Sequence, residues 1–276
     1  GQPNSFAGSM NQAWPLAAGL SLFALFALFQ RPLSRLMLLP LGVLAVASGA
    51  LALTAGALVA SFSRGGWVGA LAGGMVLAIA ALPAVEPPLR RIGRRLLIAG
   101  GMVGALVVTL GGGGLLPAPL AQRLASITAN LRLFDVRSVM VTPENFAVVE
   151  RMAHLQAGWN MLNARPLLGV GPGNYSIAFE QPPRLDAPRF TTRPWFESRG
   201  HAHNYYVHIA AETGIIGLLA YLGLIGAVAV QAGRAVRRAR HWLWRGVAVG
   251  CAGVVAAVAA HNVFENLHVL NMGLQL

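Results

Sequence analysis

Charged side chains are scarce in this chain. Of its 276 residues 11% are charged, against roughly a quarter in ordinary soluble domains, while 55% are hydrophobic and the mean hydropathy is +0.59. Lysine is absent, so all 21 basic residues are arginines, and the only cysteine is Cys251. One cysteine excludes an internal disulfide, a CxxC redox pair and a multi-cysteine zinc site. These shortages predict an all-α polytopic membrane protein rather than a soluble domain.

Several short motifs are also missing. The chain has no HExxH, its acidic residues form no obvious ligand cluster, and no GK[ST] follows a glycine-rich turn. We therefore expect no metal and no nucleotide cofactor. The net charge of +12 would suggest nucleic acid in a soluble protein, but the arginines lie mostly beside apolar runs, so no nucleic-acid partner is expected. A signal peptide is not visible and the chain stops without a polar tail, so we expect a fragment that lacks the start and could also lack the end of a longer protein.

Six apolar runs are long enough to cross a membrane, which takes about 20 residues. They cover residues 13–29, 36–60, 67–85, 96–116, 205–230 and 246–264. The predicted organisation is therefore four transmembrane helices within 1–116, a large and partly helical loop over 117–204, and two further transmembrane helices with an outer-face tail over 205–276.

Arginine positions predict the orientation of these spans. They cluster in three short loops, at Arg31 and Arg35, at Arg90, Arg91, Arg94 and Arg95, and at Arg234, Arg237, Arg238, Arg240 and Arg245. With six spans these loops fall on one side, which the positive-inside rule makes cytoplasmic. The loop over 117–204, the Ser61–Gly66 turn and the 261–276 tail then lie outside. Every unusual polar group is thus expected on the outer face.

The long loop has three recognisable parts. Its helical part is predicted over 147–163, with an apolar face of Val148, Met152, Leu155, Trp159 and Leu162. A proline at 166 should end this helix. The glycine turn over 169–173 resembles a phosphate-binding loop, but it lacks the preceding strand and the glycine spacing of one. The proline-rich segment over 181–194 is expected to be irregular and could form a lid.

Histidine supplies the strongest candidate for chemistry. His203 lies at the predicted outer membrane boundary, next to Asn204, and a neutral imidazole can accept a proton from a hydroxyl group. His201 is two residues away and could be a supporting group or the base itself. Glu212 could orient an imidazole or only cap a helix. The polar end at 261–266 could line the same cavity or be only a helix end.

Two arginines are candidates for binding an anion. Arg64 stands alone between two apolar runs, where an ionisable group is by default a functional hypothesis, although it could simply snorkel to the interface. Arg151 follows Glu150 on the predicted loop helix and could be only half of a surface ion pair. Arginine offers a permanent charge and paired donors that suit phosphate oxygens.

These motifs together resemble the superfamily of O-antigen ligases, polysaccharide polymerases and protein O-oligosaccharyltransferases. The resemblance covers nearly the whole chain and is carried by five segments. They are Gly1–Gly8, Ser63-Arg64-Gly65, Pro166–Gly171, His203-Asn204 with Gly214-Ile215-Ile216-Gly217, and His261–Asn266. It implies a GT-C-like, multi-pass protein of the bacterial inner membrane whose active site faces the periplasm. Because members of the superfamily usually have more than six spans, it also implies that this chain is a fragment lacking several N-terminal spans.

The resemblance also implies an activity and roles for residues. A glycan would move from a polyprenyl-diphosphate donor to a hydroxyl of the lipid A core, or of another glycan or a protein. Arg64 and Arg151 would bind the diphosphate, with Asn204 and His201 beside the substrate, and His203 would activate the acceptor. We expect a metal-independent, inverting glycosyltransferase. A transporter of lipid-linked sugars and a membrane scaffold are the alternatives from other classes.

Overall fold

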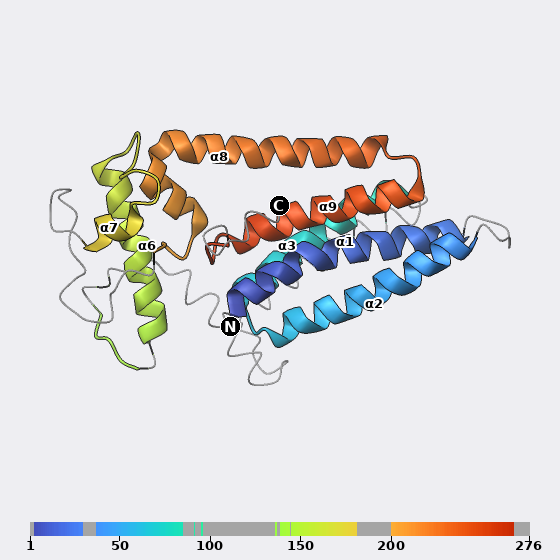
Figure 1. Ribbon diagram of the computed structural model, residues 1–276, viewed down its shortest axis with the longest axis horizontal. Coiled ribbons are helices and arrows are strands. Elements are labelled where there is room, and N and C mark those ends of the chain that lie inside the picture. Colours follow the sequence, from blue (N-terminus) through green and yellow to red (C-terminus); the bar gives the residue numbers. More distant parts are fainter. Residues whose placement is uncertain are drawn as a thin grey trace. The chain divides into compact units, whose positions relative to one another are not determined.

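The structure, a computed structural model, describes residues 3–29, 37–84, 136, 139–143, 145–180 and 200–267, together with Arg91 and Arg95. Every element in these ranges is a helix (Figure 1). They are α1 (Pro3–Phe29), α2 (Leu38–Ala60), α3 (Arg64–Ala81), the 3-10 turn η2 (Leu82–Ala84), α6 (Phe146–Ala164), α7 (Tyr175–Glu180), α8 (Tyr205–Arg238) and α9 (Trp242–His261). The predicted all-α class is confirmed.

Five of these helices are long and apolar enough to cross a membrane. They are α1, α2, α3 extended through η2, α8 and α9. They match five of the six predicted spans, and the sixth, over 96–116, lies outside the described residues, as does the proline-rich segment over 181–194. The chain is therefore a multi-pass membrane protein.

The chain divides into two compact units. The first contains Gly1–Ala125 and Ile225–His261, and the second contains Ser126–Leu224 and Asn262–Leu276. Most of the described apolar helices belong to the first unit. The second unit contains α6, α7 and the beginning of α8, together with the turn that follows α9.

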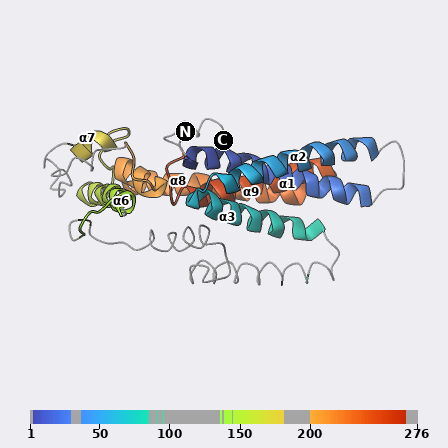
Figure 2. The ribbon, with the colours of Figure 1, turned by 90° about the horizontal axis from the view of Figure 1, so that it is seen from below.

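Small residues allow the helices of the first unit to pack closely. In Figure 2, α1, α2, α3 and α9 run alongside one another. A Cβ atom on Gly250 would lie 2.7 Å from the Cα of Leu16, and one on Gly73 would lie 2.8 Å from the carbonyl oxygen of Gly253. Helices usually associate in lipid through such close approach of their backbones. Lipid tails are as apolar as the side chains, so burying a side chain between helices gives no hydrophobic free energy.

A short turn separates α2 from α3. The Ser63 hydroxyl accepts a hydrogen bond from the Gly66 amide at 3.1 Å, which caps α3, and donates to Asn4 Oδ1 of α1 at 2.8 Å. Arg64 is the first residue of α3 and is half-buried. The predicted turn is present, and Arg64 lies where the helix dipole adds to its own positive charge.

The second unit is organised around α6. This helix confirms the prediction for 147–163, and it ends one residue before Arg165 and Pro166. Its apolar face was predicted only in part. Met152 is buried and Leu155 packs against the core, but the buried face also carries Val149, Ala153, Ala157 and Met161, while Trp159 is exposed. The small residues permit this rotation, since they let Tyr175 and Phe179 of α7 pack against the helix.

Candidate active site

The two glycine motifs of the second unit bind each other through their backbones. We call residues 166–171 together with 211–215 the glycine clasp. The amides of Val170 and Gly171 donate to the carbonyl oxygens of Ala211 and Glu212, both at 2.9 Å. In return the Ile215 amide donates to Pro166 O at 2.8 Å. These bonds satisfy polar groups that a break in helix α8 would otherwise leave without partners.

The break itself requires glycine. Gly214 has φ 69° and ψ −169°, a conformation that is essentially restricted to glycine. A Cβ atom here would overlap the backbone of Leu167, and one on Gly169 would overlap the backbone of Glu212. The glycine turn is therefore a structural support for α8. Because the amides of Gly169, Val170 and Gly171 already donate to backbone oxygens, the turn is poorly suited to binding phosphate.

A short loop places His203 at the start of α8. His203 has φ 52°, an uncommon conformation for a residue other than glycine. The next residue, Asn204, caps α8 by accepting from the Val207 amide at 3.0 Å, and its Nδ2 donates to Val263 O at 3.0 Å. The loop is thus fastened both to α8 and to the turn that follows α9.

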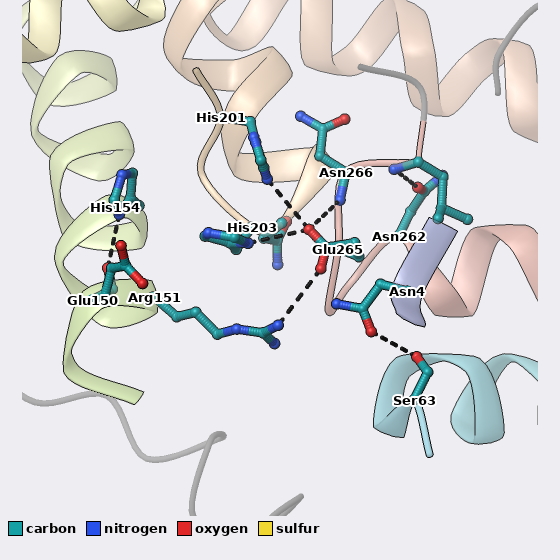
Figure 3. A network of polar contacts seen from close by, with 12 residues as sticks. Asn4, Ser63, Glu150, Arg151, His154, His201, His203, Asn262, Glu265 and Asn266 are labelled. Carbon is teal, nitrogen blue, oxygen red and sulfur yellow. Dashed lines mark hydrogen bonds and ion pairs between the residues drawn. The ribbon is translucent and has the colours of Figure 1, made fainter. Parts of the chain in front are cut away.

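The carboxylate of Glu265 joins the polar side chains of this unit, and Figure 3 shows them converging on it. Its Oε1 lies 3.1 Å from His203 Nδ1, 3.3 Å from His201 Nε2 and 3.3 Å from the amide of Asn266. Its Oε2 lies 3.6 Å from a guanidinium nitrogen of Arg151. We call these five residues the glutamate network. Glu265 is only 3% exposed, and a buried carboxylate needs such partners to remain charged.

These contacts determine which nitrogen of His203 holds a proton. An ionised carboxylate can only accept hydrogen bonds, so His203 Nδ1 must donate to Glu265. In the neutral imidazole the lone pair then lies on Nε2. The rings of His201 and His154 pack edge-on against His203, with centroids 4.4 Å and 5.5 Å away, so its ring is held on two sides. His203 is thereby arranged as a proton acceptor.

Burial and neighbouring charges shift two pKa values in this network. Burial of His203 lowers its pKa below the ordinary 6.5, and the positive charge of Arg151 acts in the same direction, whereas Glu265 opposes both. For Glu265, burial raises the pKa, but hydrogen bonds from His201 and His203 and the charge of Arg151 outweigh it. The net pKa of Glu265 lies well below its usual range. At neutral pH the pair is a neutral imidazole beside a carboxylate.

A small pocket opens beside this pair. Its polar wall contains Arg151, His203 and Asn204. Its apolar wall contains Val148, Met152, Leu155, Ala202, Val263 and Phe264. Three of the predicted site residues therefore share one pocket, and the segment 261–266 contributes Val263 and Phe264 to its wall. His201 is more buried and does not line the pocket, which favours His203 as the residue that meets a ligand.

The other predicted residues have different surroundings. Arg64 lies in the first unit, at the start of α3, so its role stays a prediction. Glu212 does not contact His203; it accepts from the Tyr175 amide at 3.1 Å and lies 3.7 Å from His208 Nε2. Burial, with a smaller contribution from the charge of Glu212, raises the pKa of Tyr175, whose hydroxyl donates to a backbone oxygen of α6. These contacts are structural.

His201, His203 and Glu265 could also hold a metal ion by distance, because their ligand atoms all lie within 4.8 Å of one another. One feature disfavours a cation there. The guanidinium of Arg151 lies 3.6 Å from the same carboxylate and already supplies a positive charge to it. We therefore interpret the cluster as a hydrogen-bonded network.

Glu265 is the residue that sequence reasoning missed as a partner for His203. It is 62 residues from His203 along the chain, in a short turn after the last described helix. Its only signal in the sequence is its place in the polar end at 261–266, a pattern that fits a cavity wall and a helix end equally well. No spacing rule connects a residue in this turn with a histidine that precedes α8.

Comparison with known proteins identifies one family. The sequence model described as O-antigen ligase matches residues 49–222, which is more than half of the chain. The match includes Arg64, Arg151, the His201–Asn204 loop and the glycine clasp, and it ends before Glu265. A search of curated proteins finds no match.

Proposed function

The chain belongs to the O-antigen ligase family, and from this premise we propose that it transfers a glycan from a polyprenyl diphosphate to an acceptor hydroxyl. The family supports an activity of the ligase or polymerase type and partners that include a lipid-linked glycan. We propose further that the protein lies in the bacterial inner membrane with its active site facing the periplasm. The arginines in the short loops support this orientation.

The observation that carries the proposal is that His203, which is paired with Glu265, lines one pocket together with Arg151. A histidine whose Nδ1 donates to a buried carboxylate is held in the tautomer of a general base. An arginine on the same wall supplies a permanent charge for phosphate oxygens. A base and an anion-binding group in one pocket are what transfer from a diphosphate to a hydroxyl requires.

The donor would be bound by its diphosphate. We assign this task to Arg151 in the pocket and, from the resemblance, to Arg64 at the start of α3. When the bond between the anomeric carbon and the phosphate oxygen breaks, its electron pair remains on the leaving diphosphate. Fixed guanidinium groups stabilise that developing charge, and this kind of stabilisation is often the largest single contribution to catalysis.

The acceptor would be activated by His203. Its Nε2 takes the proton of the acceptor hydroxyl as the oxygen forms a bond with the anomeric carbon on the face opposite the diphosphate, so the configuration inverts. General base catalysis of this kind contributes about 10²–10⁴-fold. The proton on His203 is then released to solvent or to the departing diphosphate. In this mechanism the arginines take the place of a metal.

We propose the lipid A core as the acceptor, because the family description names ligation. A deletion strain separates this from polymerisation. Uncapped core with accumulated lipid-linked donor is the expected phenotype, whereas a single repeat on the core would mean a polymerase. Unchanged surface glycan would contradict both and would support a scaffold.

Alanine variants of the proposed residues test the mechanism in the same strain. Plasmids carrying His203→Ala, Arg64→Ala or Arg151→Ala should fail to restore the glycan, while membrane fractions should contain each variant at the normal level. Gly223→Ala is a suitable control, because a Cβ atom at Gly223 has nothing within 4 Å. Full restoration by all three alanine variants would exclude the assignment.

A further inference from the structure

Glu265 lies between the two groups to which the proposed function assigns chemistry. One of its oxygens lies within 3.3 Å of two histidine nitrogens and a backbone amide, and its other oxygen faces Arg151. The same carboxylate thus contacts the residue proposed to activate the acceptor and the residue proposed to bind the donor. This inference rests on the proposed function and concerns how binding of the donor affects activation of the acceptor.

The two sides of the carboxylate are held with different strength. The contacts of Oε1 to His203 and His201 are of hydrogen-bond length and both rings are largely buried. The contact of Oε2 with Arg151 is 3.6 Å, longer than a hydrogen bond, and the Arg151 side chain is 38% exposed. Water can reach the guanidinium side of this ion pair, although the carboxylate itself is buried, so the Arg151 contact is the weaker of the two. Arg151 is therefore the partner that a ligand can remove.

A diphosphate in the pocket would compete for Arg151. Phosphate oxygens carry more charge than one carboxylate oxygen and can accept two parallel bonds from a guanidinium group. Once Arg151 bonds to the donor, its positive charge no longer offsets the negative charge of Glu265, which then acts more strongly on the histidines. The groups that face His203 are then Glu265 from the turn after α9, His201 from its own loop, and His154 from α6.

We propose that Glu265 is a positioning residue that couples donor binding to acceptor activation. It holds His203 in the tautomer whose Nε2 accepts a proton, and it holds Arg151 only until a diphosphate replaces it. Before the donor binds, the guanidinium charge weakens His203 as a base. After the donor binds, that charge is neutralised and the base becomes stronger. The hydroxyl is then deprotonated only where a donor is ready to react.

Nitrogen NMR of the full-length protein in detergent tests the tautomer without turnover. With ¹⁵N-labelled histidine, and the His203 signals identified by their loss in His203→Asn, the wild-type protein should show the Nδ1–H form. Glu265→Gln should move His203 towards the Nε2–H form. Glu212→Gln is the matched control, because it neutralises the other carboxylate near a histidine of this unit and should leave His203 unchanged. An unchanged tautomer in Glu265→Gln would overturn the proposal.

A titration with farnesyl diphosphate tests the coupling. In the wild type the probe should move the protonation of His203 to higher pH, and in Glu265→Gln this movement should be smaller. Binding is measured separately by calorimetry, so that a bound probe without any movement counts against the coupling. Circular dichroism at the same pH shows that each variant is folded.

Kinetics distinguish this inference from the function on which it rests. Glu265→Gln should lower kcat by about 10²–10⁴-fold, as expected for a base that loses its orienting carboxylate, and Glu265→Asp should recover part of the loss. If His203→Ala, Arg64→Ala and Arg151→Ala are all fully active, the proposed function fails. If His203→Ala is inactive while Glu265→Gln keeps the wild-type kcat and pH profile, only the inference fails.

Discussion

The glycine clasp and the glutamate network lie in the same compact unit but use different forces. The clasp consists of backbone hydrogen bonds between glycine-rich segments that approach too closely for side chains. The network consists of charged and polar side chains around one buried carboxylate. Changes in the clasp should therefore affect folding, whereas changes in the network should affect chemistry. Each prediction below tests that division.

The largest effect is expected at Gly214. Gly214→Ala should destabilise the protein by more than about 3 kcal/mol, because a side chain is strained in this conformation and its Cβ atom would overlap the backbone of Leu167. Thermal unfolding in detergent measures the change. Gly223→Ala on the same helix is the control and should change stability by less than about 1 kcal/mol. Equal stability of the two variants would refute the structural role of the clasp.

Acid pH should act on the network alone. His203 must be neutral to accept a proton, and burial lowers its pKa below 6.5. The transfer rate should therefore be constant near neutral pH and fall about tenfold per pH unit below the lowered value. A rate that already falls above pH 7 would contradict this environment for the base.

The clasp should remain intact over the same pH range. The folded-state pKa of Glu265 is depressed, so its contribution to stability is present above the ordinary value of 4.5 and is lost only as the pH falls through the lowered value. Circular dichroism between pH 5 and 8 should show no unfolding. Loss of helix in step with loss of activity would mean that the two regions are not separable.

A smaller effect is expected at His201. His201→Gln should lower kcat less than about tenfold, because a glutamine amide can still donate to Glu265 and His201 does not line the pocket. Transfer assays on the purified protein give the value, with His203→Gln measured beside it. A greater loss in His201→Gln than in His203→Gln would transfer the role of base to His201.

The smallest effect is expected from a chelator. Because two donors and a guanidinium group already surround the Glu265 carboxylate, EDTA should leave the transfer rate unchanged. The assay compares treated enzyme with enzyme to which zinc, magnesium or calcium is returned. Inactivation that one of these metals reverses would show that His201, His203 and Glu265 act as metal ligands instead.

Much of the fold could be predicted because its signals are local. A long run of apolar residues predicts a transmembrane helix without any knowledge of the rest of the fold, and five described helices are long and apolar enough to confirm that prediction. The periodicity also predicts the helix over 147–163, but it identifies the buried face only in part, through Met152 and Leu155. The orientation of a helix depends on what packs against it, and the small residues Ala153 and Ala157 proved more important than the larger Trp159.

The sequence by itself determined the class of the protein and directed attention to Arg151, His203 and Asn204, because composition and polarity can be read one segment at a time. Only the tertiary structure decided what those residues contact. Glu265 meets His203 across 62 residues, and the glycine turn meets the break in α8 across about 40. Such contacts depend on how distant segments fold together, which no local pattern records.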